Sequence, residues 1–197
     1  MHPLLQSFTA STSPSLKICG VTSPADADRL AQLGVDALGI NFWPESKRYC
    51  PLDSARGFLP SLRNRILRIG VFVNAEPGLP LSLLASDLID VAQFHGDEDL
   101  AYCNAFAQEG LPFFKAIGVE NDADLSIAPR YHASGILLDA HAPGVYGGTG
   151  QVIDWNMAAE FIAKTRRRRR RRAPTATKPP RNHKTLSTRE NPRSSIL

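Results

Sequence analysis

The sequence is poor in cysteine and has no long hydrophobic segment. Its three cysteines, Cys19, Cys50 and Cys103, are an odd number without metal-site spacing, so we expect reduced thiols, a cytoplasmic location and no bound metal. No apolar run approaches the roughly 18 residues of a membrane span, so we expect no membrane partner. Residues 1–14 lack arginine and the long apolar centre of a signal peptide. We expect them to be a disordered extension or the product of a start codon assigned too early.

Positive charge is scarce in most of the chain and concentrated at its end. The formal net charge is +4, but residues 166–197 hold 12 of the 23 Lys and Arg residues and only one of the 19 Asp and Glu residues. The preceding part is therefore acidic overall. Because the average hides this contrast, the pI of about 9.1 says nothing about the partners of the body of the chain.

Short apolar segments alternate with helical patterns from residue 15 onward. Six segments are predicted as strands, at 15–19, 36–42, 66–73, 89–94, 112–117 and 135–139. Helices are predicted between them at 24–33, 51–62, 79–86 and 98–109, the last capped by Asp97, with a weak helix or loop at 121–130. A glycine-rich loop at 143–150 and a helix at 155–164 are expected to follow the sixth strand.

This alternation predicts an α/β fold with a parallel sheet, because the chain must cross back before each new strand. The strands are almost continuously apolar, as expected when both faces of a sheet are covered. A doubly wound open sheet and a (β/α)₈ TIM barrel both fit the pattern. No GxGxxG follows the first strand and no GxxxxGK occurs, so the usual nucleotide-binding open sheets lose support.

Polar residues at the carboxyl ends of the strands are the candidates for chemistry, because this rim holds the active site of a barrel. They are Cys19, Asn41, Asn74, His95, Lys115 and Asp139. Cys19 and Asp139 form a plausible acid–base pair, since burial beside apolar neighbours raises a carboxyl pKa and a thiolate is a good base. The ordinary alternatives are a small buried hydrophobic residue for Cys19 and a helix cap for Asp139.

Five motifs resemble the phosphoribosylanthranilate isomerase family in order and spacing. They are KICGVTSPADA (17–27), FWPESKRYCPLDSA (42–55), VFVN (71–74), QFHGDE (93–98) and LLDA…YGGTGQVIDW (137–155). The resemblance implies a (β/α)₈ barrel and an aldose–ketose isomerase of tryptophan biosynthesis, with no cofactor. Its substrate would be the phosphosugar N-(5'-phosphoribosyl)anthranilate and its reaction an Amadori rearrangement.

The same resemblance implies roles for individual residues. Asp139 matches the general acid that protonates the furanose oxygen, and Cys19 matches the general base that removes the proton from C2. Arg48 matches the arginine that holds the substrate, and His95 is expected at the substrate site. Gly147 and Gly148, with Gly150, suit a loop that closes over the site.

The resemblance stops near Thr165. The predicted domain therefore spans 15–165 as an incomplete barrel, in which six βα units are recognisable and the sequence shows no strands 7 and 8. Residues 166–197, which begin with seven arginines, are predicted to be a disordered basic tail, possibly from a frameshift or faulty gene model. The loops after strands 7 and 8 usually bind phosphate in such barrels, so little activity is expected from this chain alone.

Three alternatives to an active isomerase stay open at this point. One is an inactive remnant of the same enzyme, and another is a related sugar-phosphate barrel with a different substrate. The third is a nucleic-acid binder that uses the arginine run for non-specific, salt-dependent phosphate contacts. That interpretation explains the tail but none of the five motifs before it.

Overall fold

Six parallel strands form one sheet whose spatial order is the order of the sequence, β1-β2-β3-β4-β5-β6. The computed structural model describes residues 2–140, 156 and 159–163, and the chain divides into the units Met1–Phe161 and Ile162–Leu197. The strands are β1 (Lys17–Cys19), β2 (Ala37–Asn41), β3 (Leu67–Phe72), β4 (Val91–Phe94), β5 (Phe113–Val119) and β6 (Gly135–Ala140). All six agree with the predicted strands to within two residues at each end.

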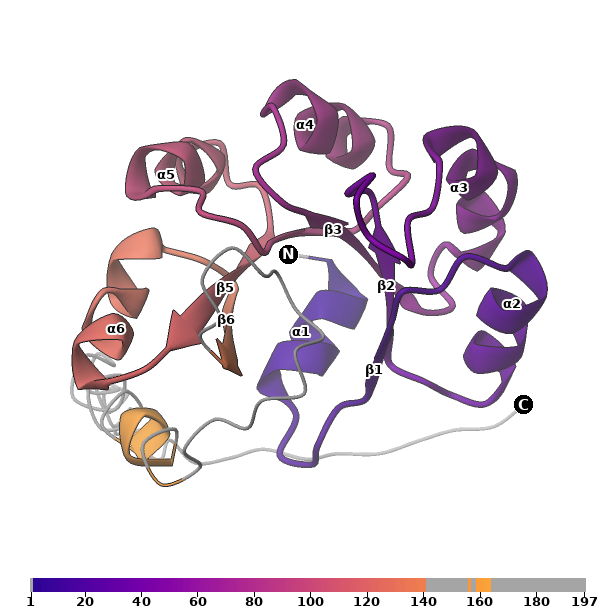
Figure 1. Cartoon of the computed structure of the whole chain (residues 1–197). Helices are drawn as coiled ribbons and strands as arrows, with labels where there is room; N and C mark the ends of the chain where they lie inside the picture. The colour runs from indigo at the N-terminus through magenta and orange to yellow at the C-terminus, as the bar shows by residue number, and fades with distance from the viewer. Residues whose placement is uncertain (1, 141–155, 157–158, 164–197) are drawn as a thin grey trace, which may run out of the picture. The chain divides into compact units, whose positions relative to one another are not determined.

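Helices follow the strands in regular alternation and cover the convex side of the curved sheet (Figure 1). They are α2 (Pro24–Gln32), α3 (Leu52–Phe58), η1 (Leu59–Leu62), α4 (Gly78–Ala85), α5 (Leu100–Gln108), α6 (Asp122–Ser126) and η2 (Ala128–Tyr131). Predicted helix 51–62 is split at Leu59, because Pro60 lacks the amide hydrogen that an α-helix needs. The weak segment at 121–130 forms α6 and η2.

The cap of α5 differs from the prediction. The side chain of Asp99, not Asp97, accepts a hydrogen bond from the amide of Tyr102 at 2.7 Å. Asp97 is held elsewhere, since its amide donates to the side chain of Asn74. The helix therefore begins two residues later than predicted, and the residues before it form the end of the β4–α5 loop.

Strand alternation separates two apolar layers. On the outer face, Leu38, Ile40, Phe72 and Phe94 pack with the surrounding helices in the larger core. On the inner face lies a smaller cluster of Leu5, Ala37, Leu67, Ile69, Val91 and Phe114. Because both faces are covered, β2, β3 and β4 are buried along their whole length, which explains their unbroken apolar sequence.

The predicted disorder of residues 1–14 is wrong for Pro3–Ala10, which form helix α1. This helix lies on the concave side of the sheet (Figure 1), where Leu5 is fully buried and Phe8 stacks on Phe114 at 6.1 Å between ring centroids. Leu4, Leu5 and Phe8 lie on one helical face, and this face packs against an apolar surface of the sheet. Its partners stand within the first three positions of their strands, so α1 covers the amino-terminal part of the inner face.

Several predicted features lie wholly or partly outside the described residues, namely the loop at 143–150, part of the helix at 155–164 and the basic tail from 166 on. Residues 156 and 159–163 are helical. Within the described part of the chain, no helix has the length and apolarity that crossing a bilayer requires.

Candidate active site

The inner face of the sheet carries a line of polar side chains toward its carboxyl end. Lys17 and Cys19 are two residues apart on β1, and Gln93 and His95 are two apart on β4 and just beyond it, so each pair shares a face. The Lys17 ammonium donates to Oε1 of Gln93 at 2.8 Å across three strand positions. This contact places both pairs on the same inner face.

His95 connects this line to Asp139. Nε2 of Gln93 lies 2.8 Å from Nδ1 of His95, and Nε2 of His95 lies 3.0 Å from Oδ2 of Asp139. Gln93 is 1% exposed, whereas the Asp139 side chain keeps about a third of its surface accessible. Asp139 therefore combines a protein partner with access from outside, as a proton donor to a ligand requires.

Cys19 lies against Gly39 at the other side of the line. A Cβ atom added at Gly39 would come within 2.7 Å of the Cys19 sulfur and 3.1 Å of Cε of Lys17. Any larger residue at position 39 would therefore displace both side chains. Cys19 is the only partly exposed thiol of the three, since Cys50 and Cys103 are buried.

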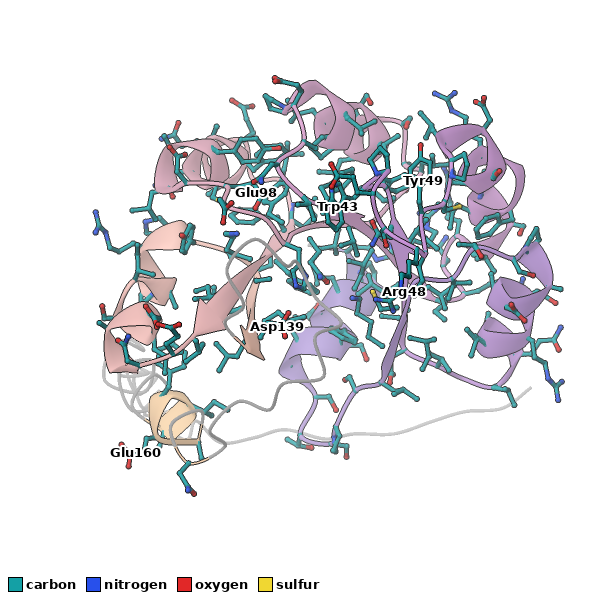
Figure 2. All side chains as sticks on the ribbon, in the orientation of Figure 1. Trp43, Arg48, Tyr49, Glu98, Asp139 and Glu160 are labelled. Atoms are coloured by element: carbon teal, nitrogen blue, oxygen red, sulfur yellow. The ribbon has the colours of Figure 1, made fainter. Side chains whose placement is uncertain are left out.

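Arg48 reaches back to β1 from the loop after β2. Its Nη1 donates to the carbonyl oxygen of Cys19 at 3.0 Å, and its side chain passes directly over Gly20, which has a positive φ of 83°. Figure 2 shows Arg48 and Asp139 coming from separate elements, the β2–α3 loop and β6. Arg48 remains exposed, so its remaining guanidinium hydrogens are available to an anionic ligand.

Asn41, a rim candidate from the sequence, organises the loop that carries Arg48. Its Oδ1 accepts from the Trp43 amide at 2.9 Å, and its Nδ2 donates to Oγ of Ser46 at 2.9 Å. Ser46 Oγ in turn accepts from the Arg48 amide at 3.1 Å. Asn41 is 8% exposed, so it acts through the loop conformation.

Lys115 and Asn74 also have structural partners. Lys115 points to the outer side, where its Nζ lies 3.0 Å from Oε2 of Glu98 in a buried ion pair and donates to the Gly96 carbonyl at 2.7 Å. Oε1 of Glu98 accepts from the Asn74 amide at 2.9 Å. These bonds fix the β4–α5 loop, next to His95, to β3 and β5. Because Lys115 is buried in this ion pair on the outer side, it is not part of the candidate site.

Burial separates the cysteines chemically. Loss of solvation raises the pKa of the Cys103 thiol to about 12, and burial likewise raises the pKa of Cys50. Neither thiol is available as a base at neutral pH. Among the described residues, no cluster of three or more His, Cys, Asp and Glu could hold a metal ion.

Of the predicted site, the structure pairs Arg48 with the backbone of Cys19 and His95 with Asp139, and it places Cys19, His95 and Asp139 on the inner face. Gly147 and Gly148 lie outside the described residues. The sequence interpretation assigned no role to Lys17 and Gln93, although both stand inside quoted motifs. Their spacing of two from Cys19 and from His95 was the available signal, because such residues share a strand face.

A curved parallel sheet with helices on its convex side, and polar groups gathered at the strands' carboxyl ends, defines a protein of the (β/α)-barrel class. A family model described as N-(5'phosphoribosyl)anthranilate (PRA) isomerase matches residues 16–170. The chain belongs to this isomerase family, whose members act in tryptophan biosynthesis.

Individual relatives agree with this assignment. The N-(5'-phosphoribosyl)anthranilate isomerase of Thiobacillus denitrificans is 42% identical over 144 residues, covering 72% of this chain and 69% of the relative. The crystal structure of the Thermotoga maritima isomerase superposes with a TM-score of 0.67 at 35% identity, covering 76% of this chain and 72% of that one. A further isomerase structure, solved with reduced 1-(o-carboxyphenylamino)-1-deoxyribulose 5-phosphate, is 38% identical with a TM-score of 0.58, covering 64% of this chain and 65% of that one.

Proposed function

We propose that this chain converts N-(5'-phosphoribosyl)anthranilate into 1-(o-carboxyphenylamino)-1-deoxyribulose 5-phosphate, with Asp139 as acid and Cys19 as base. The observation that carries the proposal is that both side chains belong to one inner face, where Lys17, the neighbour of Cys19 on that face, is connected to Asp139 through Gln93 and His95. The complex of a relative with the reduced form of this product supports the substrate class.

The first step is opening of the furanose ring. Asp139 gives its proton to the ring oxygen, the bond from C1 to that oxygen breaks, and the nitrogen lone pair forms a protonated Schiff base with C1. The carboxylate left on Asp139 accepts the hydrogen bond from Nε2 of His95, 3.0 Å away, which stabilises the charge formed in this step.

The second step moves a proton from carbon. The Cys19 thiolate takes the proton on C2, and the C–H electrons form a C1–C2 double bond while the iminium nitrogen becomes neutral. The resulting enaminol tautomerises to the ketone by moving its hydroxyl proton to C1. No electrons leave the substrate, so the reaction needs no redox partner.

Arg48 provides the substrate contact in this scheme. Its guanidinium is exposed and anchored at one end to the Cys19 carbonyl, so a bound anthranilate carboxylate would lie beside the base. His95 has both ring nitrogens in contact with protein groups, and its predicted substrate contact stays a prediction. The free thiols also support the proposed cytoplasmic location.

Turnover by the purified full chain tests the proposal. We expect slow conversion of N-(5'-phosphoribosyl)anthranilate, since the sequence shows no strands 7 and 8. Cys19→Ser and Asp139→Asn should lower it by a further factor of about 10²–10⁴, since each removes one proton-transfer group. Asp53→Asn is the matched control, because the side chain of Asp53 is almost fully exposed on α3. The proposal is wrong if the purified chain does not turn over the substrate, or if the two variants turn over like the wild type.

A further inference from the structure

Lys17 and Gln93 form a directed hydrogen-bond line to the acid of the proposed site. Successive distances are 2.8 Å from Lys17 Nζ to Gln93 Oε1, 2.8 Å from Gln93 Nε2 to His95 Nδ1, and 3.0 Å from His95 Nε2 to Asp139 Oδ2. The line joins three strands that are not neighbours, β1, β4 and β6. Lys17 and Gln93 are 76 residues apart in the sequence, and His95 and Asp139 are 44 residues apart.

The chemistry of Lys17 gives the line a direction. A lysine ammonium has only donors, so the group of Gln93 that faces it must be the amide oxygen. The amide nitrogen, which only donates, is then turned toward Nδ1 of His95. Nδ1 must accept, so the ring hydrogen of the neutral imidazole is on Nε2, where it donates to Asp139.

We infer that Lys17 and Gln93 are positioning residues that set the Nε2–H tautomer of His95 and through it orient the carboxyl of Asp139. The inference rests on the proposed function only for its catalytic consequence; the tautomer itself follows from the contacts. An imidazole with its hydrogen on Nδ1 would face the Gln93 N–H with a second donor, and it would present a lone pair to Asp139 once this carboxyl group has given up its proton.

Burial makes this direction hard to reverse. Gln93 is 1% exposed, so turning its amide would leave the oxygen against a ring nitrogen and the NH₂ against an ammonium, with little water to compensate. Gly39 supports the same arrangement, because its missing side chain leaves the path that the Lys17 stem follows beside Cys19. Lys17 therefore lies beside Cys19 and is also linked by hydrogen bonds, through Gln93 and His95, to Asp139.

The test is the tautomer of His95, measured by long-range ¹H–¹⁵N NMR on the histidine-labelled full chain. We expect the Nε2–H form in the wild type. Gln93→Glu replaces the donor by an acceptor, so we expect the ring hydrogen to move to Nδ1. Lys17→Met removes the ammonium that orients the amide, so a mixture of tautomers is expected, whereas Lys17→Arg, also donor-only, should restore the Nε2–H form.

Gln108→Glu is the matched control, since it makes the same change on the exposed end of α5 and should leave His95 unaffected. Signals of His2 and His132 report whether each variant is folded. An Nδ1–H tautomer in the wild type, or an unchanged tautomer in Gln93→Glu, would overturn the inference. The wild-type measurement needs no variant and decides the question even if Gln93→Glu does not fold.

Kinetics then separate positioning from simple support of the fold. We expect kcat to fall about ten- to a hundredfold in Gln93→Glu and Lys17→Met, with KM within about threefold, because neither residue belongs to the proposed substrate contacts. A rise in KM at constant kcat would instead make Lys17 a substrate-binding residue and contradict the inference. If the wild type shows no turnover but has the Nε2–H tautomer, the proposed function fails and the positioning line stands.

Discussion

Arg48 lies against the backbone of Gly20, so closely that a Cβ atom at position 20 would overlap Cδ of Arg48. The glycine belongs to the turn after β1, and the arginine to the loop after β2 that Asn41 and Ser46 hold in place. The position of the exposed guanidinium is therefore determined by a residue that has no functional group of its own.

Gly20→Ala should weaken ligand binding. The added methyl group pushes Arg48 away from the Cys19 carbonyl, and we expect about a tenfold loss of affinity for the reduced product, in the range of one lost charge-assisted hydrogen bond. Gly34→Ala is the control, because Gly34 has a similar positive φ of 76° but open space around it. Both variants should lose about 1–2 kcal/mol of unfolding free energy, and calorimetric titration should distinguish them. Equal affinities in the two variants would contradict the role given to Gly20.

Lys115→Met should strongly destabilise the fold. It leaves the Glu98 carboxylate buried without its cation, and breaking such a pair costs about 3–5 kcal/mol. The pair Arg65–Asp28 has the same charges but is roughly half exposed, so Arg65→Met should cost less than about 1 kcal/mol. Urea denaturation of both variants measures the difference. A loss below about 1 kcal/mol in Lys115→Met would mean that water reaches Glu98.

Leu5→Ala tests the position of α1. Leu5 is fully buried in the inner cluster, so its truncation should cost about 2–5 kcal/mol of unfolding free energy. Leu33→Ala removes the same atoms from a side chain that is 63% exposed, and its effect should stay within about 0.5 kcal/mol. If both substitutions prove equally mild in urea titrations, α1 does not pack on the sheet in solution.

Stability should decrease in alkaline solution through Cys103. Folding raises the pKa of this thiol from 9.0 to about 12, so above pH 9 the unfolded chain ionises first. The contribution is complete below pH 9 and is lost as the pH rises toward 12. Denaturation between pH 8 and 11 should show a shallower decline in Cys103→Ala than in the wild type, whatever the absolute stability of the variant.

Much of the fold could be predicted from the sequence because its signals are local. Apolar runs give the strands, and Ser23, Pro24 and Gly34 mark the ends of α2 within a few residues. Helix α1 could not be predicted in the same way, because Leu5 and Phe8 are stabilised by Val91 and Phe114, far away in the sequence. A short helix gains most of its stability from such packing and not from its own composition.

The residues of the candidate site likewise differ in whether local sequence signals could identify them. Cys19 and Asp139 follow directly from strand ends and from the family motifs, whereas Lys115 shares the strand-end signal but points to the outer face. Neighbouring residues of a strand point to opposite faces of the sheet, and Phe114 belongs to the inner cluster. Lys115, the next residue, therefore points to the outer face, unlike Cys19 and Asp139. In the sequence, nothing distinguishes Gln93 from other glutamines. Its role depends on the hydrogen bond with Lys17, which is 76 residues away.

Helix α1 has a consequence for biosynthesis. It leaves the ribosome before the strands that it covers, and its partner Phe114 on β5 is synthesised about a hundred residues later, so the two cannot meet until most of the sheet exists. Until then the apolar inner ends of β2, β3 and β4 have no cover. The nascent chain should therefore engage holding chaperones for longer than a chain whose early segments pair only with their immediate successors.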